Sequence, residues 1–275
     1  MRFKMKKLLI AGIALCTFTL TACSNEEETK DVEVVEEIDF TNAASSYKSN
    51  IMPMLTSFVE DATLLQTYIQ EGKVEEATKL YPLVHMYVER LKPLRSSFAE
   101  EFKKIDEPAV DGKELEAGGL HAIEYALYVK KDGSTVVSIA EKLVEDVTAL
   151  TAKAATTTLD GQLILEDTEH MLKEVVEKTL TSVTKNLANA QVYDVQANLE
   201  AVQSVVEAYS NNADEKLEQA LQEQLTKTLE EVAYYEVGKE DYVNFSYFTT
   251  KQMQDLINAF KATSEAFEQY VSNMK

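Results

Sequence analysis

Hydrophobic residues in the first part of the chain recur every three or four positions, a spacing that places them along one face of an α-helix. The first series consists of Tyr47, Ile51, Leu55, Phe58, Ala62, Leu65 and Ile69, and it ends at Glu71-Gly72. The second consists of Ala77, Leu80, Val84, Tyr87, Leu91, Leu94, Phe98 and Phe102. Pro53, Pro82 and Pro93 lie inside these series. Because proline lacks a backbone donor, we expect each of them to start, kink or locally open a helix.

The same periodicity predicts six further helices. After a looser stretch at 105–112, one helix carries His121 and ends near Gly133. Ser134 is the predicted N-cap of the next helix, which closes between about 156 and 161. We expect the remaining helices at about 162–186, 190–210, 213–235 and 250–273, the last of them opened by the capping-box spacing of Thr249 and Gln252.

Eight helices with short connections predict an all-α fold. The composition agrees, because eight glycines, four prolines and no tryptophan in 275 residues favour long helices over a sandwich or a doubly wound sheet. Dividing the helices four and four predicts two packed four-helix bundles, one over about 40–157 and the other over about 158–275.

The N-terminal residues have the pattern of a bacterial lipoprotein signal. A basic start precedes an apolar run of about 13 residues, which is too short to span a bilayer comfortably. Residues 1–22 are therefore predicted to be removed, leaving Cys23 as the lipid-bearing N-terminus. Residues 23–39 read as an acidic, solvated tether, so we expect the helical domain at 40–275 to lie outside the cytoplasmic membrane and to be held there by its lipid.

The charge balance narrows the class of ligand. The chain has 47 acidic and 27 basic residues, a formal net charge of −20. Such a surface repels nucleic acid and anionic lipid and attracts cations, so we expect no binding of DNA or RNA. Because Cys16 leaves with the signal and Cys23 is acylated, no disulfide is predicted in the mature protein.

One short motif carries candidate metal chemistry. His121 and Glu124 stand three residues apart in an apolar run, so a helix places both on one face. An imidazole and a carboxylate supply half of a metal site, although the same pair also occurs as a structural hydrogen bond.

Several segments in order resemble the imelysin-like peptidase family, and within it the EfeO-type iron-uptake lipoproteins. The motif G-x-H-x-x-E is present at Gly119, His121 and Glu124, and the segment at 89–93 resembles the family's E-R-I-E-P. The segments at 72–81, 193–200 and 242–249 resemble further family segments, so the resemblance covers nearly all of the chain after the tether. The chain is similar to the shorter family form, which lacks a cupredoxin-like domain.

The resemblance implies a metal ion held by His121, Glu124, Glu89 and Asp106. Such a set of mostly oxygen ligands suits Fe²⁺ or Fe³⁺, with Zn²⁺, Cu²⁺ and manganese as competitors. It also implies two partners, an EfeU-like iron permease and an EfeB-like haem peroxidase. Lys92 departs from the family because it stands where the second glutamate of E-R-I-E-P is expected, so it either alters the site or removes one ligand.

Other readings of these residues stay open. The chain lacks H-E-x-x-H, and Tyr125 breaks H-x-x-E-H, so we expect no peptidase or other enzyme activity. The main alternative to an iron carrier is an envelope adhesion or scaffold module with a structural or vestigial metal pair. His85 is interpreted as a half-buried core residue with a spare ligand role, and His170 as part of a solvated face. Tyrosines gather near the C-terminal loop, where packing is the ordinary explanation: Tyr234, Tyr235, Tyr242 and Tyr247.

Overall fold

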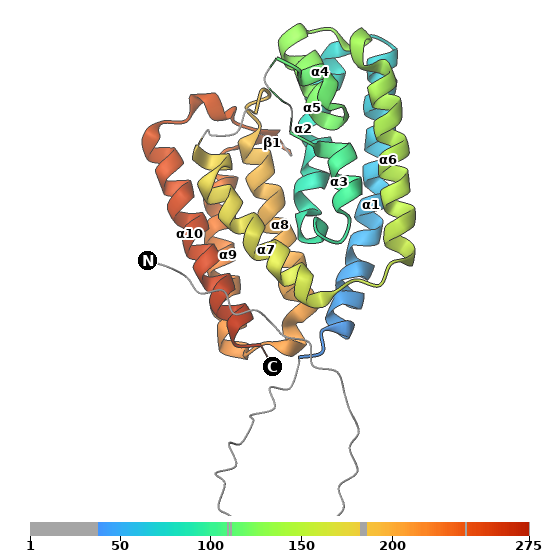
Figure 1. The fold of residues 1–275 in the computed structure, drawn as a ribbon. Helices are drawn as coiled ribbons and strands as arrows, with labels where there is room; N and C mark the ends of the chain where they lie inside the picture. The colour runs from blue at the N-terminus through green and yellow to red at the C-terminus, as the bar shows by residue number, and fades with distance from the viewer. Residues whose placement is uncertain (1–37, 109, 111, 182–185, 240, 275) are drawn as a thin grey trace, which may run out of the picture. The chain divides into compact units, whose positions relative to one another are not determined.

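The computed structural model describes residues 38–274 except 109, 111, 182–185 and 240, and this part of the chain is almost entirely helical (Figure 1). The long helices are α1 (Thr41–Gln70), α2 (Val74–Arg90), α6 (Val137–Thr156), α7 (Gly161–Glu177), α8 (Gln191–Tyr209), α9 (Glu215–Ala233) and α10 (Thr250–Ser272). Three short helices lie between α2 and α6: α3 (Ala99–Asp106), α4 (Glu114–Ala117) and α5 (Gly119–Glu124). A two-stranded antiparallel hairpin, β1 (Glu236–Gly238) and β2 (Asp241–Tyr242), follows α9. The prediction of an all-α fold is confirmed.

The first hydrophobic series forms the buried face of α1. All seven of its residues are buried, and Pro53 remains inside one continuous helix of 30 residues. Pro82 is likewise inside α2. Pro93 interrupts the second series, because a 3₁₀ turn at Lys92–Leu94 (η1) separates α2 from α3. The predicted capping box of α10 is confirmed, with Thr249 and Gln252 bonded reciprocally.

Two predicted boundaries were wrong. Ser134 does not cap α6: Asp132 accepts the backbone N–H of Ser134 and opens a 3₁₀ turn at Gly133–Val136 (η3), so α6 begins only at Val137. The helix expected at 162–186 ends at Glu177, and a 3₁₀ turn at Thr179–Thr181 (η4) follows it. The helical segment around His121 ends near Gly133 as predicted, but it has two parts: α5 ends at Glu124, and a π-helical turn, Tyr125–Lys130 (η2), continues it to Lys131.

The long helices pack side by side in two groups (Figure 1). Helix α1 lies along α6 and α2, and α10 lies along α9 and α7. Helix α8 contacts α2 and α1 on one side and α9 on the other, so it joins the two groups through a continuous hydrophobic core. The link from α6 to α7, at residues 157–160, contains the predicted boundary between bundles.

The predicted signal sequence, Cys23 and residues 24–37 of the predicted tether lie outside the described residues. Ile38 and Asp39 are exposed, and the buried Phe40 follows them at the N-cap position of α1. Across the part of the chain that the structure describes, no helix combines the length and the apolar character needed to cross a membrane.

Candidate metal site

The close approach of α5 to α3 is made by Gly119. This residue has φ of +54°, and a Cβ atom built on it would lie 2.3 Å from the backbone oxygen of Ile105. Only glycine combines such a backbone conformation with so short a contact. Because Ile105 is followed by Asp106 and Gly119 by Leu120-His121, this contact sets the last residue of α3 beside the histidine of α5.

A cavity of about 640 Å³ opens at this point, between α2, α3, α5, α7 and α8. Its charged lining consists of His85, Glu89, Lys92, Arg95, Asp106, Glu114, His121, Glu124, Glu174 and Asp194. Six carboxylates thus face one lysine, one arginine and two histidines, so the wall of the cavity favours a cation.

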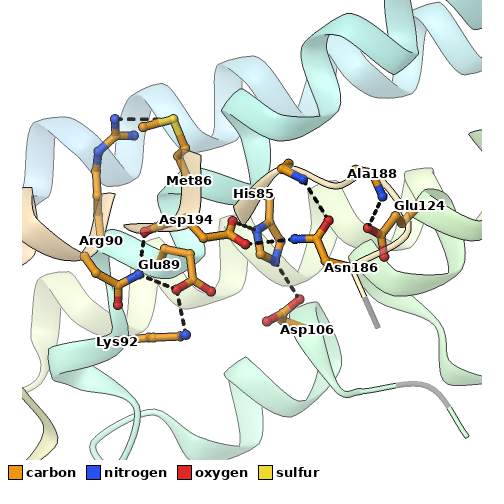
Figure 2. A network of polar contacts seen from close by, with 12 residues as sticks. His85, Met86, Glu89, Arg90, Lys92, Asp106, Glu124, Asn186, Ala188 and Asp194 are labelled. Carbon is orange, nitrogen blue, oxygen red and sulfur yellow. Dashed lines mark hydrogen bonds and ion pairs between the residues drawn. The ribbon is translucent and has the colours of Figure 1, made fainter. Parts of the chain in front are cut away.

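His85 of α2 is held by α8 in a single orientation. Its Nδ1 lies 2.8 Å from Oδ1 of Asp194, and the other oxygen of Asp194 accepts a hydrogen bond of 3.0 Å from Asn186 (Figure 2). Asn186 in turn accepts from the backbone N–H of Ala190. Because Asp194 engages Nδ1, the Nε2 atom of His85 is the nitrogen that faces the cavity.

Asp106 lies between the two histidines. Its Oδ1 is 3.5 Å from Nε2 of His85 and 3.4 Å from Nε2 of His121, distances longer than a good hydrogen bond. The Asp106 side chain is only 8% exposed, and its Oδ1 has no hydrogen-bond partner. A buried carboxylate oxygen is costly unless it has a partner, so this atom is fitted to a cation.

His121 repeats the arrangement seen at His85. Its Nδ1 lies 3.7 Å from Oε2 of Glu124, while its Nε2 faces Asp106. The other oxygen of Glu124 accepts the backbone N–H of Ala188 at 2.9 Å, so Glu124 is anchored to the segment that precedes α8 (Figure 2). Each histidine therefore has its own carboxylate on Nδ1, and both share Asp106 on Nε2.

The pKa values of the two histidines and of Asp106 are shifted in opposite directions by their mutual contacts. Burial lowers the pKa of His85, but the charges of Asp194 and Asp106 outweigh burial and raise it well above its ordinary value. Burial raises the pKa of Asp106, but the neighbouring imidazoles of His85 and His121 reverse this and lower it to about 2. The pKa of His121 is also raised, since its bond to Glu124 and the charge of Asp106 exceed the effect of burial. These shifts favour protonated imidazoles beside an ionised Asp106, so an ion that binds here must displace the imidazole protons.

Lys92 pairs with two carboxylates, Glu89 and Glu174, at the end of the cavity away from His121. Its Nζ lies 2.6 Å from Oε2 of Glu89 and 3.8 Å from Oε2 of Glu174, which also pairs with Arg95 at 3.1 Å. Asn198 donates a second hydrogen bond, 2.6 Å long, to the same Glu89 oxygen. Burial lowers the pKa of Lys92, but the charges of Glu89 and Glu174 more than compensate and raise it. Lys92 is thus the internal counter-ion of Glu89 and is itself only 7% exposed.

The structure brings all four predicted ligands, His121, Glu124, Glu89 and Asp106, to the wall of one cavity. They do not form one cluster. Glu89 is paired with Lys92 at one end of the cavity, whereas Asp106 and Glu124 contact His121 at the other end. His85 was predicted mainly as a half-buried core residue. It is buried, but its imidazole lines the cavity, so its spare ligand role deserves more weight than the prediction gave it. The sequence signal for it was its position four residues before Glu89 on α2.

Asp194 was not predicted as a site residue. It stands in α8 among buried apolar neighbours, where a carboxylate at 5% exposure requires a partner, and that pattern was the available signal. His170 is exposed on α7, as predicted. The C-terminal tyrosines do not line the cavity, and Tyr234 and Tyr247 are each 79% exposed.

The imelysin family model, also labelled peptidase M75, matches residues 39–270. The chain belongs to the imelysin family. The match includes every residue of the cavity described above, so the cavity lies inside the imelysin domain.

Curated relatives within this family are similar over most of their length. An Efem/EfeO family lipoprotein from Staphylococcus haemolyticus (strain JCSC1435) is 26% identical over 276 residues, covering 93% of this chain and 95% of the relative. Efem/EfeO family lipoproteins from Staphylococcus aureus strains MSSA476 and NCTC 8325 are each 28% identical over 235 residues, with 82% of this chain and 83% of the relative covered.

Proposed function

We propose that this protein is a lipid-anchored, extracytoplasmic iron-binding protein that captures iron and passes it to an iron permease. The observation that carries the proposal is Oδ1 of Asp106, a buried carboxylate oxygen without a hydrogen bond that faces the Nε2 atoms of two histidines. In this proposal iron is the cargo. The cavity around Asp106 is its place of capture.

The chemistry of the cavity supports iron. Imidazole nitrogen and carboxylate oxygen are ligands that iron, zinc, copper and nickel accept, and carboxylates extend the range to manganese. The acidic surface raises the local concentration of cations around the cavity. A carrier must also release its ion, and a cavity of about 640 Å³ leaves room for exchange with an incoming chelator or partner.

Membership of the imelysin family and the names of the relatives support the wider role. The relatives are named Efem/EfeO family lipoproteins, and the N-terminal signal of this chain predicts a lipid on Cys23. A lipid anchor holds the carrier close to membrane partners, for which we propose an EfeU-like permease and an EfeB-like haem peroxidase. A Cys23→Ala variant tests the anchor, since it should leave the membrane fraction and appear in the medium or soluble envelope fraction.

A carrier fits the site better than a peptidase does. Metal-assisted hydrolysis needs a general base that is free to take a proton from a metal-bound water. Glu124, which occupies the acidic position of the motif, accepts the Ala188 N–H with one oxygen and faces His121 with the other. We therefore propose a non-catalytic role.

The test is an anaerobic titration of the mature chain with Fe²⁺ and, separately, with chelated Fe³⁺. His121→Ala and Asp106→Asn remove groups from the cavity, and His170→Ala removes an exposed histidine on α7 as the matched control. Binding near one ion per chain in the wild type and the control, with loss in both cavity variants, supports the proposal. Equal binding in all four proteins places the ion elsewhere on the acidic surface, and no binding in any of them supports a scaffold role.

A further inference from the structure

We infer that the cavity holds ferrous iron through two histidines and one carboxylate, namely Nε2 of His85, Nε2 of His121 and Asp106, with Asp194 and Glu124 as the groups that orient the two imidazoles. This inference rests on the proposed function and specifies its ligand set and oxidation state. It assigns His85 to the site, and it moves Glu124 from ligand to positioning residue.

The contacts around the histidines are paired. His85 has Asp194 at Nδ1 and Asp106 at Nε2, and His121 has Glu124 at Nδ1 and the same Asp106 at Nε2. A carboxylate on one ring nitrogen fixes the tautomer and makes the other nitrogen the better metal ligand. Both Nε2 atoms converge on one oxygen, so the metal-binding nitrogens are directed to the same place.

Asp106 is the carboxylate that remains available to an ion. In the described part of the chain, the buried side-chain atoms without a hydrogen-bond partner are Tyr47 Oη, Asp106 Oδ1, Gln191 Oε1 and Asn198 Oδ1. Of these four residues, only Asp106 lines the cavity. Its Oδ1 faces both imidazoles at 3.4 to 3.5 Å, whereas Asp194 has His85 Nδ1 at 2.8 Å and Glu124 has the Ala188 N–H at 2.9 Å.

A second grouping, His85 with Glu89 and Asp194, is geometrically tighter, since candidate ligand atoms of the three lie within 4.8 Å of one another. Its oxygens are largely occupied. Asp194 accepts from His85 and Asn186, and Oε2 of Glu89 accepts from Lys92 and Asn198. An ion bound by these three residues would have to break those hydrogen bonds and would lie close to the buried ammonium of Lys92. Binding beside Asp106, between the two histidines, is therefore favoured.

The two imidazoles must approach each other to close on one ion, because their ring centroids are 6.4 Å apart. His85 is the fixed member: its side chain is 11% exposed and hydrogen-bonded to Asp194. His121 is the adjustable member, with a side chain 22% exposed and a longer contact of 3.7 Å to Glu124. Capture of the ion therefore consists mainly of a movement of His121 toward His85 and Asp106.

This ligand set favours the ferrous state. Two neutral imidazoles and a single carboxylate are the facial set that holds non-haem Fe²⁺, with further positions open. Ferric iron is a harder ion and requires more anionic oxygen. The remaining carboxylates are not free to supply it, because Glu89 is neutralised by Lys92 and Glu124 is anchored by Ala188.

The experiment counts the imidazoles bound to iron. The mature chain in detergent is loaded anaerobically with Fe²⁺ and treated with nitric oxide, which gives a paramagnetic complex. Electron spin-echo modulation from this complex reports coordinated imidazole nitrogen. We expect two imidazoles in the wild type and in His170→Ala, and one in His121→Ala and in His85→Gln. The glutamine is chosen because its amide can still donate to Asp194.

The Glu124→Gln variant tests whether Glu124 binds the ion itself or only orients His121. We expect it to keep two imidazoles while Fe²⁺ binds about 10- to 100-fold more weakly, the usual cost of losing an orienting partner. The wild type should not take Fe³⁺ from a citrate chelate under conditions in which it retains Fe²⁺ through gel filtration.

Each outcome has a separate meaning. Iron bound with a single imidazole in the wild type, or with His85→Gln unchanged, overturns the inference while the carrier proposal stands. Preference for Fe³⁺ overturns the assignment of oxidation state. Absence of iron binding in the wild type refutes the proposed function itself. If His85→Gln does not fold, the wild-type count and the His121→Ala count still decide between two imidazoles and one.

Discussion

Replacing Gly119 by alanine tests whether the contact between α3 and α5 builds the site. The new Cβ would lie 2.3 Å from the oxygen and 2.7 Å from the carbonyl carbon of Ile105. These are backbone atoms, so the clash cannot be relieved by rotation of a side chain. Helix α5 must move away from the end of α3, which separates His121 from Asp106.

The magnitude has two parts. Gly119 has φ of +54°, where alanine costs about 1 kcal/mol of folding free energy relative to glycine. Forced displacement of packed backbone adds about 2 kcal/mol, in the range seen for overpacked interiors. The sum of about 3 kcal/mol corresponds to a fall in Tm of roughly 9 °C for a domain of this size.

Gly72 provides the matched control. It has φ of +70°, but a Cβ built on it meets nothing within 4 Å. Gly72→Ala should therefore carry the backbone cost alone, about 1 kcal/mol or roughly 3 °C in Tm, and should leave iron binding unchanged. Calorimetry of both variants and an Fe²⁺ titration at a temperature where both are folded make the comparison. Equal shifts in Tm, or full iron affinity in Gly119→Ala, would refute the reasoning.

Three further predictions concern stability. Lys92→Met should lower the free energy of unfolding in urea by about 3 kcal/mol, because Glu89 is left buried without its cation. Adding Glu89→Gln should recover most of this loss. A double variant as unstable as Lys92→Met alone would contradict the pairing. Glu174, whose pKa is lowered from 4.5 to about 2 because Lys92, Lys178 and Arg95 outweigh its burial, stabilises the fold above pH 4.5 by up to about 3 kcal/mol. Glu174→Gln should therefore be less stable than wild type at pH 7 and approach it as pH falls from 4.5 to 2; a constant difference across that range excludes the linkage. Thr249→Ala should cost about 1 kcal/mol through loss of the α10 cap, and an unchanged urea midpoint would show that the cap contributes little.

The order and type of the helices could be predicted because their signals are local. The series from Tyr47 to Ile69 has a period of three to four residues whatever it packs against, and that period alone predicts a helix with one buried face. The pairing of His121 with Glu124 is equally local, since three residues on a helix bring two side chains to one side. The resemblance to the imelysin family likewise rests on ordered residues, and the family match confirms it.

Helix boundaries were harder to predict, because one depended on a choice between two nearby capping residues and another on a residue of a different helix. Ser134 is a good cap by residue type, yet Asp132 takes the capping role two residues earlier because its carboxylate reaches the Ser134 N–H. The break at Gly118-Gly119 follows from the approach of Ile105, a residue of another helix.

Only the tertiary structure decided the composition of the site. His85 and Asp194 are 109 residues apart, and nothing in either segment specifies that α2 and α8 will lie side by side. The sequence also left open whether Lys92 alters the site or removes one ligand, and only its distance of 2.6 Å to Oε2 of Glu89 shows that it pairs with that carboxylate. Periodicity determines which face of a helix is buried. Packing determines which charged groups meet there, because electrostatic partnership depends on distance in space and not along the chain.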